Sequence, residues 1–288
     1  MKALGFIGLG VMGEPICRNL IAKSGLPLAA FDLAPEPLAR MRQAGAATAG
    51  SVADIAAAAD VIFLCLPSAA HVQRVCDDRL LAQLRAGTIV VDLGTTSVRV
   101  TRDLSERCSS RGAHWIDAPI ARTRQAAQDG TLSVMVGSMP ELYARVEPLI
   151  RSFASDVTLC GPTGCGQLTK ILNNMVLFQT VNALTEAVAV ARRNGVDPAL
   201  LLDTLSKGSA DSFALRNHGM KSIVPGVYPD RAFSTEYARK DLSYALELAA
   251  DAGLRLEGAE LVAALLDDAA AAGNGDAYFP VIARRFER

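Results

Sequence analysis

Short runs of almost continuously apolar residues recur from Met1 to Gly161 and then stop. They read ALGFIGLG, LPLAAFDL, DVIFLCLP, TIVVDLG, AHWIDAP, TLSVMVG and DVTLCG, and amphipathic stretches separate them. Strands of a parallel sheet have this pattern because helices cover both faces of the sheet. The pattern predicts a doubly wound α/β domain over residues 1–161.

Residues 162–288 contain helical patterns and no further strand-like run, so we expect an all-α second domain. Asp197 followed by Pro198 is a typical helix start. The segment from about Gly164 to Asn194 has no Pro and no Gly after Gly166. It predicts one helix of about 28 residues that joins the two domains.

Composition limits the partners of this chain. Lys and Arg total 29 against 30 Asp and Glu, so no excess positive charge favours nucleic acid. The most apolar stretch, residues 53–66, is too short to span a bilayer and contains Asp54 and Asp60. The first residues lack the pattern of a signal peptide. We expect a cytoplasmic protein that binds neither nucleic acid nor membrane.

The six cysteines and three histidines show no metal-site spacing and no C-x-x-C pair. We expect buried, reduced thiols, and neither a metal site nor a disulfide.

Three glycines, Gly8, Gly10 and Gly13, form G-x-G-x-x-G between the first apolar run and a helical stretch. The first permits a tight turn, the second lets a pyrophosphate approach the backbone, and the third lets helix and strand pack closely. The helix N-terminus attracts phosphate. We therefore predict that this loop, with Leu9, Val11 and Met12, binds a dinucleotide in a Rossmann domain.

Asp32 follows the second apolar run, where a carboxylate can bind both ribose hydroxyls of a dinucleotide. A helix-capping aspartate before Pro35 is the alternative, and the strand and helix patterns on either side disfavour it. A carboxylate here would repel the 2′-phosphate of NADP, and no Arg follows before Arg40. The sequence favours NAD as cofactor.

Four blocks carry a resemblance over nearly the whole chain. They are GLGVMGEP from Gly8, DAPIARTRQAAQDGTLSVMVG from Asp117, GPTGCGQLTKILNN from Gly161, and RKDL with Lys240 and Asp241. Their order and spacing resemble the β-hydroxyacid dehydrogenase family, which includes 3-hydroxyisobutyrate dehydrogenases and tartronate semialdehyde reductases. The resemblance implies hydride transfer between NAD and a small 3-hydroxy acid or its semialdehyde.

In that family a lysine on the interdomain helix is the catalytic acid or base, and Lys170 matches it. A proton must leave or reach the substrate oxygen when hydride moves, and a buried amine has a pKa lowered towards neutrality. A surface lysine is the alternative, and the K-x-x-N-N context argues against it. Asn174 lies one helical turn on, where its amide could hold the substrate.

Further site residues follow from the resemblance. Leu66 and Pro67 end one apolar run, and Thr96 follows the next, at the sheet edge where ligands bind. The family resemblance implies that these residues form part of the cofactor wall. Lys240 matches a family lysine on the cofactor and substrate side. A solvated helix charge is the alternative for Lys240.

Ala121, Arg122 and Thr123 stand where the family pattern is S-G-G, a loop that grips the substrate's carboxylate. They resemble the sulfolactaldehyde reductase branch, where an Arg-Thr pair receives a sulfonate. An arginine fork can bind either acid group, so a small anionic substrate is implied and its acid group stays open. A solvent-facing Arg122 is the alternative.

Other functions share this architecture. Imine reductases usually lack the catalytic lysine, so Lys170 argues against that class. A non-enzymatic module would have lost the lysine and gained basic additions, and neither feature is present. The family also implies a homodimer or homotetramer.

Overall fold

The computed structural model describes residues 1–230 and 232–287, and the chain divides into two compact units. The first unit is Met1–Lys170 and the second is Ile171–Arg288. The division falls inside helix α9 (Cys165–Arg193), which contributes to both units. The sequence-based boundary between residues 161 and 162, where strand β9 ends, stays a prediction.

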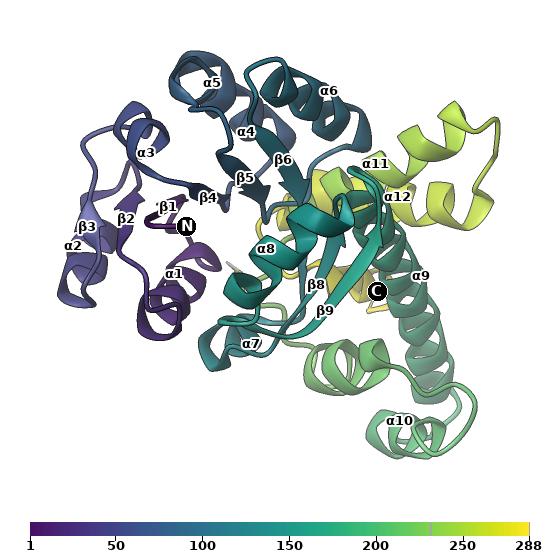
Figure 1. Ribbon diagram of the computed structural model, residues 1–288. Helices are drawn as coiled ribbons and strands as arrows, with labels where there is room; N and C mark the ends of the chain where they lie inside the picture. Colours follow the sequence, from purple (N-terminus) through teal and green to yellow (C-terminus); the bar gives the residue numbers. More distant parts are fainter. Residues whose placement is uncertain (231, 288) are drawn as a thin grey trace. The chain divides into compact units, whose positions relative to one another are not determined.

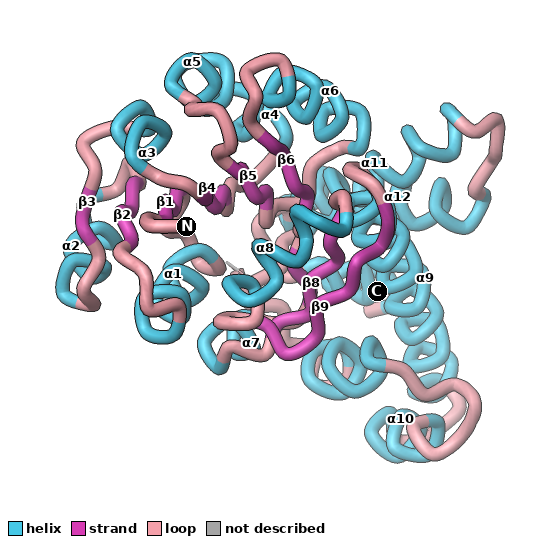
Figure 2. The backbone as a smooth tube through the Cα atoms, viewed as in Figure 1, coloured by secondary structure: helices cyan, strands magenta, loops and turns pink. Residues whose placement is uncertain are grey.

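A single sheet forms the centre of the first unit (Figures 1 and 2). Within residues 1–170, its strand order is β3-β2-β1-β4-β5-β6-β8-β7, with β9 paired to β8. The strands are β1 (Leu4–Ile7), β2 (Leu28–Phe31), β3 (Ala47–Thr48), β4 (Val61–Leu64), β5 (Ile89–Asp92), β6 (His114–Asp117), β7 (Ile120–Ala121), β8 (Leu132–Gly137) and β9 (Ala154–Gly161).

The prediction of a doubly wound α/β domain is confirmed. All pairings among strands β1 to β6 are parallel. The later strands depart from this pattern, because β8 is antiparallel to both β6 and β7 and parallel to β9. The two-residue strands β3 and β7 were not predicted, since so short a segment has no hydrophobic period.

Helices cover both faces of this sheet. They are α1 (Gly13–Lys23), α2 (Pro35–Gln43), α3 (Val52–Ala58), α4 (Ala69–Val75), the π-helix η1 (Cys76–Leu80), α5 (Leu81–Gln83), α6 (Val98–Ser109), α7 (Arg124–Asp129) and α8 (Pro140–Ile150). Helix α1 contacts α2 and α7, whereas α3 contacts α5 and α4 contacts α6.

The central strands are buried on both faces, which explains their unbroken apolar character. Leu4 and Phe6 of β1 pack in one core with Ile16 and Leu20 of α1. Ile7, the next residue after Phe6 and on the opposite face, is also 2% exposed. A strand that is buried on both faces needs apolar residues at every position, whereas a strand with one exposed face alternates apolar and polar residues.

The second unit is helical, as predicted. Besides the C-terminal part of α9, it contains α10 (Pro198–Leu205), the π-helix η2 (Leu215–Ile223), α11 (Thr235–Asp251), α12 (Glu257–Ala269), the π-helix η3 (Ala270–Asn274) and the 3₁₀-helix η4 (Phe279–Phe286). Its β pairing within the described residues consists of isolated bridges such as Asp230 to Ala277. The rings of Phe178, Phe233 and Phe279 pack together in its core.

The predicted long helix is confirmed. Helix α9 has 29 residues, which gives a length of about 43 Å. Asp197 caps α10 as expected, since its side chain accepts a hydrogen bond from the Leu200 N–H.

Across residues 1–230 and 232–287, no helix combines the length and hydropathy that a bilayer crossing requires. The same residues contain no group of three or more His, Cys, Asp or Glu placed to hold a metal ion. All six cysteines are free, and Cys17, Cys76 and Cys108 are buried.

Close packing at the start of α9 makes Gly166 sensitive to substitution. A Cβ atom there would lie 2.4 Å from the Met135 carbonyl oxygen and 2.7 Å from the Gly137 nitrogen. We expect Gly166→Ala to destabilise the protein by about 1–3 kcal/mol, measured by thermal unfolding. Gly208→Ala is the matched control, because its nearest neighbour would be 3.8 Å away. Equal unfolding temperatures for both variants would contradict this packing.

Candidate active site

The glycine-rich loop between β1 and α1 has no room for a Cβ atom at two positions. Gly8 has a φ of +97°, and a Cβ there would lie 2.4 Å from the Cys65 carbonyl oxygen. A Cβ at Gly13 would lie 2.0 Å from the Gly8 carbonyl oxygen. A Cβ at Gly10 would meet nothing within 4 Å. The side of the loop at Gly10 is therefore open, and a phosphate can approach its backbone.

The carboxylate of Asp32 is held by backbone N–H groups on both of its oxygens. Leu9 N–H donates to Oδ2 at 2.5 Å, and Ala34 N–H donates to Oδ1 at 2.8 Å. Asp32 is half-buried, directly after β2. The structure thus brings together the glycine loop and the carboxylate that the sequence paired.

These residues fit the adenosine and pyrophosphate half of a nicotinamide dinucleotide. The N-terminus of α1, which has 11 residues, directly follows the loop and favours negative charge. Val11 is exposed and Met12 half-buried on the same loop. The position open at Gly10, together with the fixed Asp32 carboxylate, would suit a phosphate and a ribose respectively.

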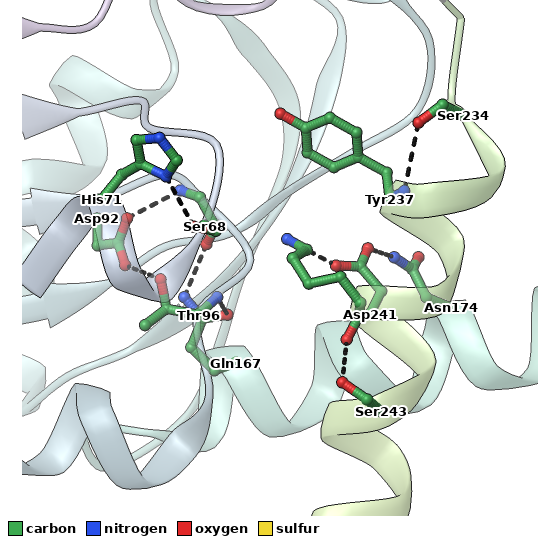
Figure 3. A network of polar contacts seen from close by, with 12 residues as sticks. Ser68, His71, Asp92, Thr96, Gln167, Asn174, Ser234, Tyr237, Asp241 and Ser243 are labelled. Atoms are coloured by element: carbon green, nitrogen blue, oxygen red, sulfur yellow. Dashed lines mark hydrogen bonds and ion pairs between the residues drawn. The ribbon is translucent and has the colours of Figure 1, made fainter. Parts of the chain in front are cut away.

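The predicted cofactor-wall residues lie after β4 and β5. Leu66 is half-buried and Pro67 is exposed, while Thr96 is fully buried. The Thr96 hydroxyl donates to Asp92 Oδ2 at 2.7 Å, and its N–H donates to Gln167 Oε1 at 3.0 Å. These two hydrogen bonds hold Thr96 in place at the carboxyl edge of the sheet (Figure 3).

Gln167 fastens the first turns of helix α9 to this edge. Besides accepting from Thr96, its side-chain amide donates to the Gly94 carbonyl oxygen at 2.8 Å. Gln167 and Thr96 are both completely buried. The contact fixes α9 against the end of β5, three residues before Lys170.

A second fastening comes from Asp117 at the end of β6. Its Oδ1 accepts from Gly164 N–H at 2.7 Å and its Oδ2 from Gln167 N–H at 2.8 Å. Burial raises the pKa of Asp117 to about 6, against the opposite pull of these backbone hydrogen bonds. Asp117 thus caps helix α9 with a carboxylate from a different element.

Lys170 and Asn174 lie one turn apart on α9, as predicted. Lys170 is 8% exposed and Asn174 is 1% exposed. A lysine so buried is uncommon, and burial of this kind is a frequent property of functional lysines. The burial of Lys170 disagrees with the alternative of an ordinary surface lysine, and its catalytic role stays a prediction.

Within the second unit, one buried carboxylate holds two predicted site residues. Asn174 Nδ2 donates to Asp241 Oδ2 at 2.7 Å, and Lys240 Nζ lies 2.9 Å from Asp241 Oδ1 (Figure 3). The Lys240 ammonium also lies 5.2 Å from the ring centroid of Tyr237 and 5.6 Å from that of Tyr244. Lys240 is therefore a fixed cation rather than a freely solvated helix charge.

The loop after β7 has an unusual backbone at Arg122. Its φ is +86°, the left-handed region that favours glycine. The guanidinium donates to the Thr131 carbonyl oxygen at 2.7 Å and to Ser155 Oγ at 2.9 Å, and it pairs with Asp156 at 2.8 Å. Thr123 caps α7, and Ala121 ends β7. Arg122 is thus anchored to the start of β9, with its charge matched by Asp156.

Several residues of this region were not among those predicted. Asp117 and Gln167 fix the start of α9, and Asp92 accepts a hydrogen bond from Thr96. Asp241 contacts Asn174 and Lys240, and Asp156 pairs with Arg122. A signal was available for Asp92 and Asp117, because each ends an apolar run at the edge where ligands bind. Asp156 had no comparable signal.

Comparisons with known proteins cover both units. Residues 3–161 match a family model described as the NAD binding domain of 6-phosphogluconate dehydrogenase. Residues 164–285 match one described as NAD-binding of NADP-dependent 3-hydroxyisobutyrate dehydrogenase.

Individual relatives agree with these matches. The chain is 31% identical over 274 residues to a 2-(hydroxymethyl)glutarate dehydrogenase of Eubacterium barkeri, covering 94% of this chain and 90% of the relative. It is 33% identical over 256 residues to a 3-hydroxyisobutyrate dehydrogenase of Pseudomonas aeruginosa, covering 85% of each. A solved Mycobacterium tuberculosis 3-hydroxyisobutyrate dehydrogenase with L-serine has a TM-score of 0.91 at 29% identity, covering 100% of both chains.

The pKa of Asp117 generates a prediction about stability and pH. Because its folded pKa is about 6 and its ordinary value 3.8, folding favours the protonated form. This contribution to stability is complete below about pH 4 and is lost as pH rises through about 6. The unfolding free energy of the wild type, minus that of Asp117→Asn, should fall by on the order of 2–3 kcal/mol from pH 4 to pH 7. A difference that stays flat or grows over this range would contradict the raised pKa.

Proposed function

The chain belongs to the β-hydroxyacid dehydrogenase family, and from this premise we propose that it interconverts a small 3-hydroxy acid and its semialdehyde with NAD. It is an oxidoreductase that uses a nicotinamide cofactor. The observation that supports the proposal most is the buried pair Lys170 and Asn174 on a helix fastened at its start to the sheet edge.

Lys170 is the proton-transfer group in this proposal. The bound cofactor supplies the ring that accepts or donates hydride. The Lys170 amine takes the hydroxyl proton of the 3-hydroxy acid in the oxidising direction and returns it to the aldehyde oxygen in the reverse direction. Asp117 and Gln167 hold the start of α9, which limits how far the amine can drift from the substrate oxygen.

Asn174 orients the substrate from the next turn of the same helix. Its Nδ2 donates to Asp241 and its Oδ1 accepts from Asn173 at 3.1 Å, so the orientation of the amide is fixed and its second N–H is the donor proposed for the substrate. Lys240, held by the same carboxylate, is the cation that the family resemblance assigns to cofactor and substrate binding in this proposal. Asp241 acts through these two residues and is a positioning residue.

The loop of Ala121, Arg122 and Thr123 binds the substrate's acid group in this proposal. The Arg122 fork offers N–H donors, although Asp156 already neutralises part of its charge. A substrate anion would share the guanidinium with Asp156. Carboxylate and sulfonate both suit such a fork, and the sulfolactaldehyde-type reductase is therefore the second candidate function.

A substrate panel tests the proposal. NAD reduction is followed with 3-hydroxyisobutyrate, L-serine and 2-(hydroxymethyl)glutarate, and NADH oxidation with sulfolactaldehyde. Alcohols of equal size that lack an acid group are the controls. We expect turnover only with acid-bearing compounds, because in this proposal the substrate is bound through its acid group at the loop of Arg122. Equal turnover of uncharged alcohols, or none with any compound, would contradict the proposal.

Replacement of Lys170 tests its role. We expect Lys170→Ala to lower kcat about 10²- to 10⁴-fold, because a positioned acid–base group contributes that much. Affinity for NADH, measured by fluorescence titration, should stay nearly unchanged, since the amine acts on the substrate oxygen. A thermal melt checks that the variant is folded, and a folded variant with near-normal kcat would exclude Lys170 as the proton-transfer group.

Two substitutions at Arg122 separate its side chain from its backbone. Arg122→Gly removes the guanidinium but suits the positive φ, whereas Arg122→Ala removes it and keeps the backbone strain. Both should raise KM for acid substrates about tenfold. This is the lower end of the effect of losing a charge-assisted hydrogen bond, and we expect it because the Arg122 side chain is partly exposed. If Arg122→Gly retained the wild-type KM, the side chain would not bind the acid group.

Cofactor preference is the last test of this function. Because Asp32 presents a carboxylate where NADP carries its 2′-phosphate, we expect NADH to bind at least about tenfold more tightly than NADPH. Asp32→Ala should narrow this difference. Equal affinities of the wild type for NADH and NADPH would contradict the proposed preference for NAD.

A further inference from the structure

A bidentate ion pair joins the first turn of α1 to α2. Arg40 donates from Nε to Glu14 Oε1 at 2.8 Å and from Nη2 to Glu14 Oε2 at 2.7 Å. Arg18 adds one longer contact to Glu14 at 3.3 Å. The hydrogen bonds from Arg40 are the main cause that lowers the pKa of the Glu14 carboxyl. Glu14 is therefore ionised, and the Arg40 fork is occupied.

The position of this pair in the fold concerns the cofactor. Glu14 directly follows Gly13, and Asp32 is tied to the same glycine loop through the Leu9 N–H. Helix α2 begins at Pro35, shortly after Asp32. Because side chains on a helix lean towards its N-terminus, Arg40 extends towards the end of α2 that follows Asp32. Its guanidinium meets Glu14 in the first turn of α1, which follows the loop that is tied to Asp32 through Leu9.

No other cation is as well placed along this stretch of the chain. The sequence has no Lys or Arg between Asp32 and Arg40. Arg42, the other arginine of α2, donates to Thr48 Oγ1 at 2.9 Å. Arg40 is thus the first guanidinium after the ribose-binding carboxylate, and an arginine there is the usual partner of a 2′-phosphate.

We propose that Glu14 is a second determinant of cofactor choice, which acts by keeping Arg40 from the 2′-phosphate of NADP. With Glu14 in place, a carboxylate occupies the Arg40 fork, and the Asp32 carboxylate remains to repel a 2′-phosphate. Without Glu14, the same arginine can meet a phosphate with its two-pronged fork. The proposal rests on the preference for NAD proposed above and names a residue beyond Asp32 that maintains it.

Binding of the two reduced cofactors tests the role of Glu14. Dissociation constants for NADH and NADPH are measured by cofactor fluorescence for Asp32→Asn, for Asp32→Asn with Glu14→Gln, and for these two with Arg40→Ala. The double variant should bind NADPH about tenfold more tightly than Asp32→Asn alone. Adding Arg40→Ala should remove that gain, and NADH affinity should change far less than NADPH affinity.

A matched control and a single variant test whether the gain in NADPH affinity comes from Glu14 and Arg40. Asp32→Asn with Arg18→Ala should show no gain for NADPH, since Arg18 makes only the longer contact to Glu14. Glu14→Gln alone should already improve NADPH binding a few-fold, which covers the case of a poorly folded Asp32 variant. The gain should shrink as salt rises, because the side chains are partly exposed.

Three outcomes would overturn the proposal. They are no gain from Glu14→Gln in either background, a gain that survives Arg40→Ala, and an equal gain from Arg18→Ala. If the wild type bound NADPH as tightly as NADH, the proposed preference for NAD would fail instead. If the wild type prefers NADH and the Glu14 variants change nothing, only the role of Glu14 fails.

Discussion

The chemistry proposed for this chain depends on how the first turns of α9 are fastened to the sheet. Asp117 from β6 accepts backbone N–H bonds from Gly164 and Gln167, and the Gln167 side chain bridges Gly94 and Thr96 beyond β5. Buried hydrogen bonds of this kind are costly to break because the freed groups have no water to replace their partners. The helix that carries Lys170 therefore starts from a fixed point on the sheet.

A different interaction dominates after β1 and β2, where charged side chains are paired with one another at the surface. Asp32 is held by two backbone N–H groups, while Glu14 and Arg40 neutralise each other across α1 and α2. Such exposed pairs add little stability, so their value lies in which ligand charge they admit. In the proposed function, buried hydrogen bonds position the catalytic helix and charged side chains determine which cofactor binds.

The sequence could predict features that depend on local pattern. The seven apolar runs became β1, β2, β4, β5, β6, β8 and β9, and the absence of Pro and Gly predicted α9. The glycine loop and Asp32 were also predictable, since their roles follow from backbone geometry and spacing. The position of Asp117 at the end of an apolar run was a signal, but its partners Gly164 and Gln167, like the partner Asn174 of Asp241, lie 47 to 67 residues away in the chain and could not be predicted. The ion pair between Arg122 and Asp156 of β9 could not be predicted either, because no sequence pattern indicates that these two residues meet.

The central claim is that the chain moves hydride directly between a 3-hydroxy acid and its cofactor. The most direct measurement uses a 3-hydroxy acid deuterated at the carbinol carbon, with NAD, followed by mass analysis of the NADH formed. Direct hydride transfer predicts that NADH gains one deuterium per turnover and that deuteration slows the chemical step in single-turnover experiments. Deuterium found in the solvent, with unlabelled NADH, would contradict direct hydride transfer.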